Sequence, residues 1–470
     1  MSDRRMVGTC VKSVLPRFLS FKPSAKMAPN AARGGVKAGS TMAGPRNAEP
    51  KCYSLSCDHL TRLSQPIRET LSRTAYTPPE GATVSIKSFL ESLLPQETPH
   101  SNHVAGDEDS KERFRKEIRD FCLCCAALAS AEGKDSPTVY WITKDLIFTA
   151  KSAFHELSKA ISLESERELF VELLPEVLPG VKGVIKESSI DTEQEEIVPA
   201  SAEVPVAHAI VAAHQFRWLV FQVGYPNLGK LCPLVIPCAL TALDHWSPEV
   251  KEQGMLSFIH IGNNMNAAEL SWYEEAILDA CCRNIPANDE LWHRVVEVSV
   301  LLLTCTQRMN PRSFWFGRML SEMLAHLEHQ PFNKERRIAW LTFIEPVFDA
   351  MGLFILAHFR RIFALFFQWM HADDDKTVIL VLERLHTIIK LTWIRKSPYI
   401  ERLVDELVLL YKESAVRKSH EVIRLHILQL LMLIQKCQES QFETAWSKHK
   451  NDPDIETLTS SFTNQSSEIV

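Results

Sequence analysis

The sequence predicts an all-α fold built from paired antiparallel helices, and three observations point to it. Apolar residues recur at three- and four-residue spacing through most of the 470 residues, which is the period of one helix face. The chain holds only 16 Gly but 25 Pro, a composition that disfavours turn-rich β folds and suits helices joined at corners. From residue 206 onward the helical segments come in pairs that repeat about every 42 residues. Together these features predict a HEAT/armadillo-type α-solenoid.

The first 51 residues differ from the rest of the chain in composition. They hold ten Lys or Arg residues but only two acidic residues, and they are rich in Ala, Ser and Gly. This composition fits a disordered basic extension, which cannot bury enough apolar surface to fold, or an organellar transit peptide. We expect a cytoplasmic protein, with the nucleus as a second compartment, in the first case. In the second case we expect a chloroplast or mitochondrial protein.

Residues 52–180 form the next predicted unit, an N-terminal helical region. Its apolar residues follow a helical period, as in the run from Leu60 to Leu71. Residues 181–205 are acidic and show no periodicity, so we expect a flexible acidic linker there. Residues 441–470 are polar, and we expect a disordered tail.

Residues 206–440 form the predicted HEAT-like repeat array. Successive pairs of helical segments start 41, 43, 42 and 44 residues apart. The five pairs are 228–243 with 248–263, 269–283 with 289–306, 312–329 with 333–351, 354–371 with 375–393, and 398–413 with 418–437. Each segment carries an apolar stripe, for example Leu291, Val295, Val298 and Leu302. A period of about 40–47 residues with two helices per unit is typical of HEAT and armadillo repeats.

The composition also argues against several classes of partner. Beyond residue 51 the chain carries 42 basic and 56 acidic residues, and so acidic a body is a poor candidate for binding nucleic acid, which requires clustered cations. The twelve cysteines stand in apolar surroundings, which indicates buried free thiols in a reducing compartment. The most apolar stretch, 353–370, contains His358, Arg360 and Arg361 near its centre, so we do not expect a membrane span either.

Motifs of catalysis and cofactor binding are missing from the sequence, which contains no GxGxxG, GxxxxGK[ST], GxSxG or HExxH. Cys122 and Cys125 form a lone CxxC without a second pair, and we interpret them as core residues. His326 and His329 have the spacing of metal ligands, but their polar neighbours indicate a solvated face. We therefore predict no catalytic residue, metal, cofactor or small-molecule substrate, and a protein that is not an enzyme.

Two features of the sequence suggest contacts with other proteins. Trp246 lies in a corner and is the tryptophan that we most expect to be exposed, and Trp is enriched at interface hot spots; alternatively, its ring covers its own turn. Basic residues gather in the last repeats, either as a ridge that binds an acidic partner or as scattered solvated cations. This basic ridge comprises Arg360, Arg361, Lys390, Arg395, Lys396, Arg402, Lys412, Arg417, Lys418 and Arg424. Its candidate partner-binding residues are Arg360, Arg361, Arg395 and Lys396.

The stretch 223–280 has a distinctive order of residues. It contains Tyr225, Pro226, Pro233, Pro237, Leu243, Asp244, Lys251, Gly254, Asn263, Asn264, Ala268, Glu269, Leu270, Tyr273, Leu278, Asp279 and Ala280. In this order these residues resemble the central segment of the Tel-two-interacting protein two family. The stretches 351–362 and 381–393 look like a later repeat of that family. The resemblance covers about residues 205–440. The positions of its family-like motif are Tyr225, Pro226, Pro237, Asp244, Gly254 and Tyr273.

The resemblance implies an all-helical HEAT-repeat subunit of the Tel-two/Tti co-chaperone complex, known as TTT. That complex works with the heat-shock chaperone machinery to mature and stabilise phosphatidylinositol-kinase-related protein kinases, including TOR and the DNA-damage checkpoint kinases. The resemblance further implies a non-enzymatic scaffold that binds the larger Tti subunit and the Tel-two subunit, and through them the chaperone and the kinase clients. We then expect the basic ridge, within residues 312–437, to contact the larger Tti subunit.

Two other interpretations remain open on the sequence. One is a solenoid adaptor of another kind, such as a nuclear-transport or phosphatase scaffold, which would share the fold and differ in its partners. The other is an organellar helical-repeat protein directed by residues 1–51. Its repeat period is longer than the roughly 34–35 residues of common RNA-reading helical repeats, which argues against RNA as its ligand.

Overall fold

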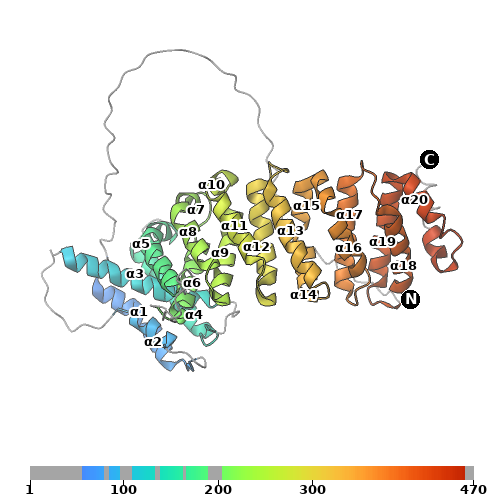
Figure 1. Cartoon of the computed structure of the whole chain (residues 1–470). Coiled ribbons are helices and arrows are strands. Elements are labelled where there is room, and N and C mark those ends of the chain that lie inside the picture. The colour runs from blue at the N-terminus through green and yellow to red at the C-terminus, as the bar shows by residue number, and fades with distance from the viewer. Residues whose placement is uncertain are drawn as a thin grey trace, which may run out of the picture. The chain divides into compact units, whose positions relative to one another are not determined.

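The computed structural model describes residues 55–78, 84–95, 108–132, 138–161, 166–188 and 204–460. The regular structure in these ranges is entirely helical, and no strand occurs in them. The chain divides into one unit of residues 1–50 and a second of residues 51–470. The second unit contains all the helices of Figure 1, whereas the predicted basic extension 1–51 lies outside the described residues.

The N-terminal helical region contains the helices α1 Cys57–Arg73, α2 Ile86–Ser92, α3 Glu108–Ser130, α4 Lys144–Ile161 and α5 Glu166–Glu187. Ser56 begins α1, because its side chain accepts a hydrogen bond from the backbone N–H of His59 at 3.2 Å. The expected stripe of α1 is buried at Leu60, Ile67 and Leu71. Helix α1 packs on α4, α3 packs on α4, and both α3 and α5 pack on the first helix of the array. The region therefore shares one core with the array.

Helix α5 runs past the predicted start of the acidic linker at residue 181, so that boundary is wrong. The reason is a buried apolar stripe that continues to the end of the helix, through Val181 and Ile185. These side chains belong to the common core, and α5 packs against the array. The remainder of the predicted linker, from 189 to 203, lies outside the described residues.

The array confirms the predicted all-α solenoid of paired helices. Its elements are α6 Val206–Phe221, α7 Asn227–Lys230, α8 Cys232–Leu243, α9 Pro248–Asn264, α10 Ala267–Ser271, α11 Glu274–Asn284, α12 Asp289–Gln307, α13 Phe314–His329, α14 Lys334–Phe343, α15 Glu345–Met351, η1 Gly352–His358, α16 Phe359–Trp369, α17 Asp375–Thr392, α18 Ile400–Glu413, η2 Ser414–Val416 and α19 His420–Cys437. Of the predicted pairs, α8 packs on α9, α11 on α12, α16 on α17 and α18 on α19, and the third consists of α13 followed by α14 and α15. The predicted stripe of α12 is buried throughout.

The second helices of the pairs form a continuous layer. Along the array α6 packs on α9, α9 on α12, α12 on α14, α14 on α17, and α17 on α19. The turns within pairs all lie at one end of the helices, and the segments that link one pair to the next lie at the opposite end (Figure 1). We call the first end the turn edge and the second the link edge. The turn edge consists of residues 244–247, 285–288, 330–333, 370–374 and 414–419, and the link edge of 222–226, 265–273, 308–314, 352–358 and 390–399.

Four segments that the sequence predicts as single helices are broken in the structure. The segment 228–243 becomes α7 and α8, 269–283 becomes α10 and α11, and 333–351 becomes α14 and α15, with Pro346 in the first turn of α15. The segment 354–371 begins as the 3₁₀ helix η1, because Gly352 ends α15 with a φ of 52°. Only glycine adopts that conformation without strain.

The same break bears on the apolar stretch Glu345–Trp369. By length and composition it could cross a membrane, with a mean hydropathy of 1.6. Length and composition are weak evidence for a span, since the core helices of globular proteins pass the same test. Here Ile355, Phe363 and Phe366 lie in the common core, and Arg360 is exposed. The stretch therefore forms part of the helical array, as α15, η1 and α16.

The predicted disordered tail 441–470 is wrong for its first half. The chain forms α20 Glu439–Trp446 and the 3₁₀ turn η3 Pro453–Ile455. Phe442 and Trp446 are one helical turn apart, stack with ring centroids 5.6 Å apart, and are buried where α20 packs on α18. They cover the last pair and act as its cap. Residues 461–470 lie outside the described residues.

Candidate interaction surface

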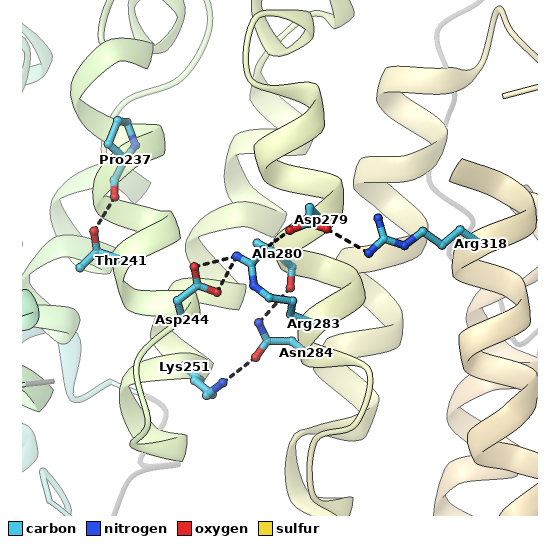
Figure 2. A network of polar contacts seen from close by, with 9 residues as sticks. All are labelled: Pro237, Thr241, Asp244, Lys251, Asp279, Ala280, Arg283, Asn284 and Arg318. Atoms are coloured by element: carbon cyan, nitrogen blue, oxygen red, sulfur yellow. Dashed lines mark hydrogen bonds and ion pairs between the residues drawn. The ribbon is translucent and has the colours of Figure 1, made fainter. Parts of the chain in front are cut away.

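A ladder of ion pairs connects the first helices of three successive pairs (Figure 2). Arg283 of α11 donates to Asp244 at the end of α8, at 2.9 Å, and also pairs with Asp279 on its own helix. Arg318 of α13 donates to Asp279 at 3.0 Å. These side chains are about a third to half exposed, and each such pair contributes at most about 1 kcal/mol. The ladder therefore fixes the register of the first helices more than it stabilises them.

A second polar contact in Figure 2 joins α9 to α11. Lys251 donates to the side-chain oxygen of Asn284 at 2.7 Å, and the Asn284 amide donates to the carbonyl of Ala280 at 2.9 Å. Burial lowers the pKa of Lys251. In α8 the hydroxyl of Thr241 donates to the carbonyl of Pro237 at 2.8 Å. The polar groups of this region therefore satisfy one another within the chain.

Charges on the turn edge are also paired within the chain. Asp289, at the start of α12, accepts from Arg336 of the next pair at 2.6 Å. Arg337 donates to Asp374 at 3.0 Å, and Asp375 accepts from the backbone N–H of Ser419 at 2.9 Å. Each of these contacts links one pair of helices to the next. The carboxylates that cap the second helices thus serve the stacking of the repeats.

The positions of the family-like motif have structural roles that the structure makes plain. Gly254 allows α9 to approach α8, because a Cβ there would lie 2.9 Å from the backbone nitrogen of Leu243. Asp244 belongs to the ladder, Pro237 lies inside α8, and Tyr273 packs partly buried against the core. Tyr225, joined to Pro226 by a cis peptide bond, is exposed on the link edge.

Trp246 is exposed, as expected, although two other tryptophans are more exposed. Its side chain is 51% exposed, against 87% for Trp272 and 57% for Trp393. Its indole N–H donates to the carbonyl of Ser188, at the end of α5, at 3.2 Å. Its ring stacks on that of His245, with centroids 5.6 Å apart. The ring therefore covers its own corner, and no finding tests the predicted contact with a partner.

His245, beside this tryptophan, is a buried histidine held in a defined neutral form. Its Nδ1 accepts from the backbone N–H of Ser247 at 3.0 Å, and its Nε2 lies 2.9 Å from the hydroxyl of Ser188. Because Nδ1 accepts, the proton is on Nε2. Burial, aided by the charge of Lys251, lowers the pKa of His245 to about 4.

The predicted basic ridge is not a continuous row of free cations. Arg361 forms a two-pronged contact with Glu328, both distances 2.7 Å. Arg402 pairs with Glu406, Arg417 with Asp375, and Lys412 with Asp452. By contrast, Arg360, Lys390, Arg395, Lys396 and Lys418 are exposed and form no ion pair within the described part of the chain. Of the four candidate contact residues, Arg361 is therefore already neutralised.

The described cysteines are free thiols, and most of them are buried. Cys122 and Cys125 lie on α3 and are buried in the core, as predicted from the sequence. Burial raises the pKa of Cys281 to about 12 and that of Cys232 to about 11, so these thiols are poor nucleophiles at neutral pH. Across the ranges that the structure describes, no three His, Cys, Asp or Glu side chains are grouped so that they could hold a metal ion.

The link edge carries a set of exposed aromatic residues that the sequence alone did not indicate as a group. They are Tyr225, Trp272, Phe314, Phe354 and Trp393. An aromatic residue in each linking segment, at the period of the repeat, is a signal that the sequence does contain. The pattern becomes informative only once the helix ends are known, because the same residue one turn away would be buried.

Comparisons with known proteins place the chain among relatives. It is 50% identical over 426 residues to the Arabidopsis thaliana protein named "Uncharacterized protein At2g39910", over 87% of this chain and 95% of that protein. It is 22% identical over 256 residues to human TELO2-interacting protein 2, and 24% identical over 252 residues to the Rattus norvegicus protein of that name. These matches cover 50% and 48% of each chain, so the chain spans about half the length of these two relatives.

Two further comparisons add little. No protein-family model matches the chain. A solved structure of an engineered protein aligns with 86% of this chain and 97% of its own, at a TM-score of 0.35 and 10% identity, which is too distant to support an argument.

The extensive match to the Arabidopsis thaliana protein shows that this chain belongs to the same family as At2g39910.

Proposed function

We propose that the protein is a non-enzymatic scaffold subunit of a TTT-type co-chaperone complex. In this role it supports the maturation and stability of phosphatidylinositol-kinase-related kinases, among them TOR and the DNA-damage checkpoint kinases. The observation that carries the proposal is the partial similarity to TELO2-interacting protein 2. The matched relatives are named for their interaction with TELO2, and the fold of this chain is a helical solenoid of the kind that binds proteins.

The surface of the array supports a scaffold role in physical terms. A solenoid offers long edges on which a partner can be held by shape and charge, without any catalytic residue. On this chain the turn edge is occupied by ion pairs between repeats, whereas the link edge presents exposed aromatic side chains. The partners under this proposal are the Tel-two subunit and the larger Tti subunit, and the expected location is the cytoplasm, with the nucleus as a second compartment.

Affinity purification of the C-terminally tagged, full-length protein from its own cells tests the proposal. Mass spectrometry is expected to recover the Tel-two and larger Tti subunits in near-stoichiometric amounts. An unrelated helical-repeat protein with the same tag serves as the control. Recovery of transport factors, phosphatase subunits or organellar proteins in place of the two subunits would contradict the proposal, and would favour one of the other solenoid functions.

A further inference from the structure

The link edge carries an exposed aromatic residue in each of its five linking segments. Tyr225, Trp272, Phe314, Phe354 and Trp393 are between 45% and 87% exposed. They follow one another at intervals of 39 to 47 residues, close to the repeat period. Figure 1 shows the elements at or beside these segments, α7, α10 and α15, along the same side of the array. One such residue is unremarkable on a protein surface, but a row with the period of the fold marks an interaction site.

Contacts within the chain hold the third, fourth and fifth segments of this edge. The guanidinium of Arg312 lies over the ring of Phe354, 5.4 Å from its centroid, which joins the third segment to the fourth. Gln438 donates to the carbonyls of Trp393 and Arg395 at 2.8 and 2.9 Å and fixes the fifth segment against the end of α19. The ring of Phe354 and the backbone at Trp393 are thus held in place, which lowers the entropy cost of binding there.

The part of the edge from the third to the fifth segment is basic. Residues 308–314, 352–360 and 390–397 contain no Asp or Glu, although acidic residues outnumber basic ones beyond residue 51. Their cations are Arg308, Arg312, Arg360, Lys390, Arg395 and Lys396. All six are exposed, and none forms an ion pair in the part of the chain that the structure describes. Exposed aliphatic side chains, Met309 and Ile394, accompany them.

The turn edge has exposed cations too, Lys334, Lys376 and Lys418, but they line one pocket together with carboxylates, among them Asp373 and Glu413. It also exposes Trp246, Phe332 and Val416, but the other two turns expose no large apolar side chain. Trp246 donates to α5. The turn-edge carboxylates Asp289 and Asp374 are matched by Arg336 and Arg337. What distinguishes the link edge from its third to its fifth segment is that exposed aromatic residues and cations occur together without any carboxylate.

We propose that the link edge from Phe314 to Trp393 binds an acidic, apolar-rich segment of a partner protein. Apolar side chains of that segment would cover Phe314, Phe354 and Trp393, and its carboxylates would pair with the free cations between them. Charge complementarity selects this occupant, and the aliphatic residues on the edge favour a protein over a nucleic acid. The inference rests on the proposed function in one respect, because the segment is assigned to another subunit of the TTT-type complex.

Direct binding to purified Tel-two and larger Tti subunits of the same organism tests the inference. The first variant of the full-length chain combines Phe314→Ala, Phe354→Ala and Trp393→Ala. The second combines Arg308→Glu, Arg312→Glu, Arg395→Glu and Lys396→Glu, which changes only exposed side chains and keeps the test valid if the first variant folds poorly. Each is expected to weaken binding by at least about tenfold. The wild-type complex is expected to weaken as salt is raised.

Matched controls alter the opposite edge. Phe332→Ala with Val416→Ala removes comparable apolar surface, and Lys334→Glu with Lys376→Glu and Lys418→Glu reverses comparable exposed charges. Both controls are expected to bind like the wild type, and circular dichroism should show the same helix content in every variant.

The outcomes separate this inference from the proposed function. If the wild type binds and both link-edge variants bind equally well, the edge is not the site, while the proposed function stands. If the wild type binds neither subunit, the proposed function fails, and the inference fails with it. A single-stranded RNA oligonucleotide is measured in parallel. Loss of RNA binding in the charge variant, with subunit binding intact, would overturn the inference and make nucleic acid the occupant.

Discussion

Gly254 shows how one residue controls the spacing of two helices. A Cβ at this buried position would lie 2.9 Å from the backbone nitrogen of Leu243 and 3.0 Å from the Cβ of Ala242. We predict that Gly254→Ala destabilises the protein by about 1–3 kcal/mol, because backbone of α8 must move. Gly317 is the matched control, since its Cβ would meet nothing within 4 Å. Gly317→Ala should stabilise α13 by up to about 1 kcal/mol.

Chemical denaturation of the two glycine variants measures both effects on the free energy of unfolding. Equal behaviour of Gly254→Ala and Gly317→Ala would contradict the close approach of α8 and α9. The opposite signs that we expect separate a steric role from the general preference of helices for Ala over Gly.

His245 gives the protein a predictable dependence on acid. Its pKa is about 4 in the folded protein, against 6.5 for an unburied histidine. Between these pH values the unfolded chain therefore binds more protons than the folded protein. The contribution of His245 to the free energy of unfolding is therefore fully present above pH 6.5. It is lost as the pH is lowered towards 4, a decrease of about 3 kcal/mol. His214, whose pKa burial lowers to about 3, acts in the same direction.

Melting temperatures of the wild type and His245→Asn between pH 7 and pH 4.5 check this prediction. The variant is expected to be less stable at pH 7, because it loses the contacts to Ser188 and Ser247, but to lose less stability on acidification. Parallel curves for the two proteins would show that His245 does not take up the proton.

At the scale of single residues the sequence identified important positions more readily than their roles. Asp244 and Gly254 stand out in the family-like motif, but the ladder to Arg283 and the approach to Leu243 depend on neighbours that only folding brings close. Trp246 is exposed as expected, but its contact with Ser188, 58 residues away, could not be foreseen. Side-chain exposure at a corner depends on which distant helix end meets it.

The helices are stacked by contacts of unequal strength. Arg336 is buried, donates to Asp289 at 2.6 Å and to the carbonyl of Ala287 at 2.8 Å, and lies over the ring of Trp292. We predict that Arg336→Ala costs about 2–4 kcal/mol, because it removes a buried guanidinium together with its hydrogen bonds to Asp289 and Ala287 and its stacking contact with Trp292. Arg283→Ala, in the exposed ladder, should cost less than about 1 kcal/mol.

Urea denaturation of these two arginine variants compares the strengths directly. A shift of the midpoint that is larger for Arg283→Ala would contradict the assignment of the turn edge as the side that joins the repeats. High salt should reduce the midpoint shift caused by Arg283→Ala more than the shift caused by Arg336→Ala, since salt screens exposed ion pairs more strongly.

Helix pairing could be predicted because apolar period and repeat length are local properties. Breaks within helices could not, since they depend on single features such as the positive φ of Gly352. The linker and tail boundaries failed for a related reason: Ile185 and Phe442 are buried by packing on α8 and α18, although their surroundings in the sequence are polar.

At the scale of the whole molecule the two edges of the array carry different chemistry. The turn edge uses its carboxylates to join successive repeats, and the link edge leaves aromatic and basic side chains exposed. The sequence predicted a basic ridge, but it could not separate Arg395, which is exposed, from Arg417, which pairs with Asp375. That distinction requires the stacking of the repeats, which brings residues 42 positions apart into contact.

The most direct test of the central claim is the abundance of TOR-type and checkpoint kinases after rapid depletion of this protein from its own cells. A scaffold of a TTT-type complex predicts that the kinase proteins decline while their transcripts stay constant. Re-expression of the wild type should restore the kinases, and the link-edge charge variant should not. Kinase levels that remain unchanged after depletion would contradict the account.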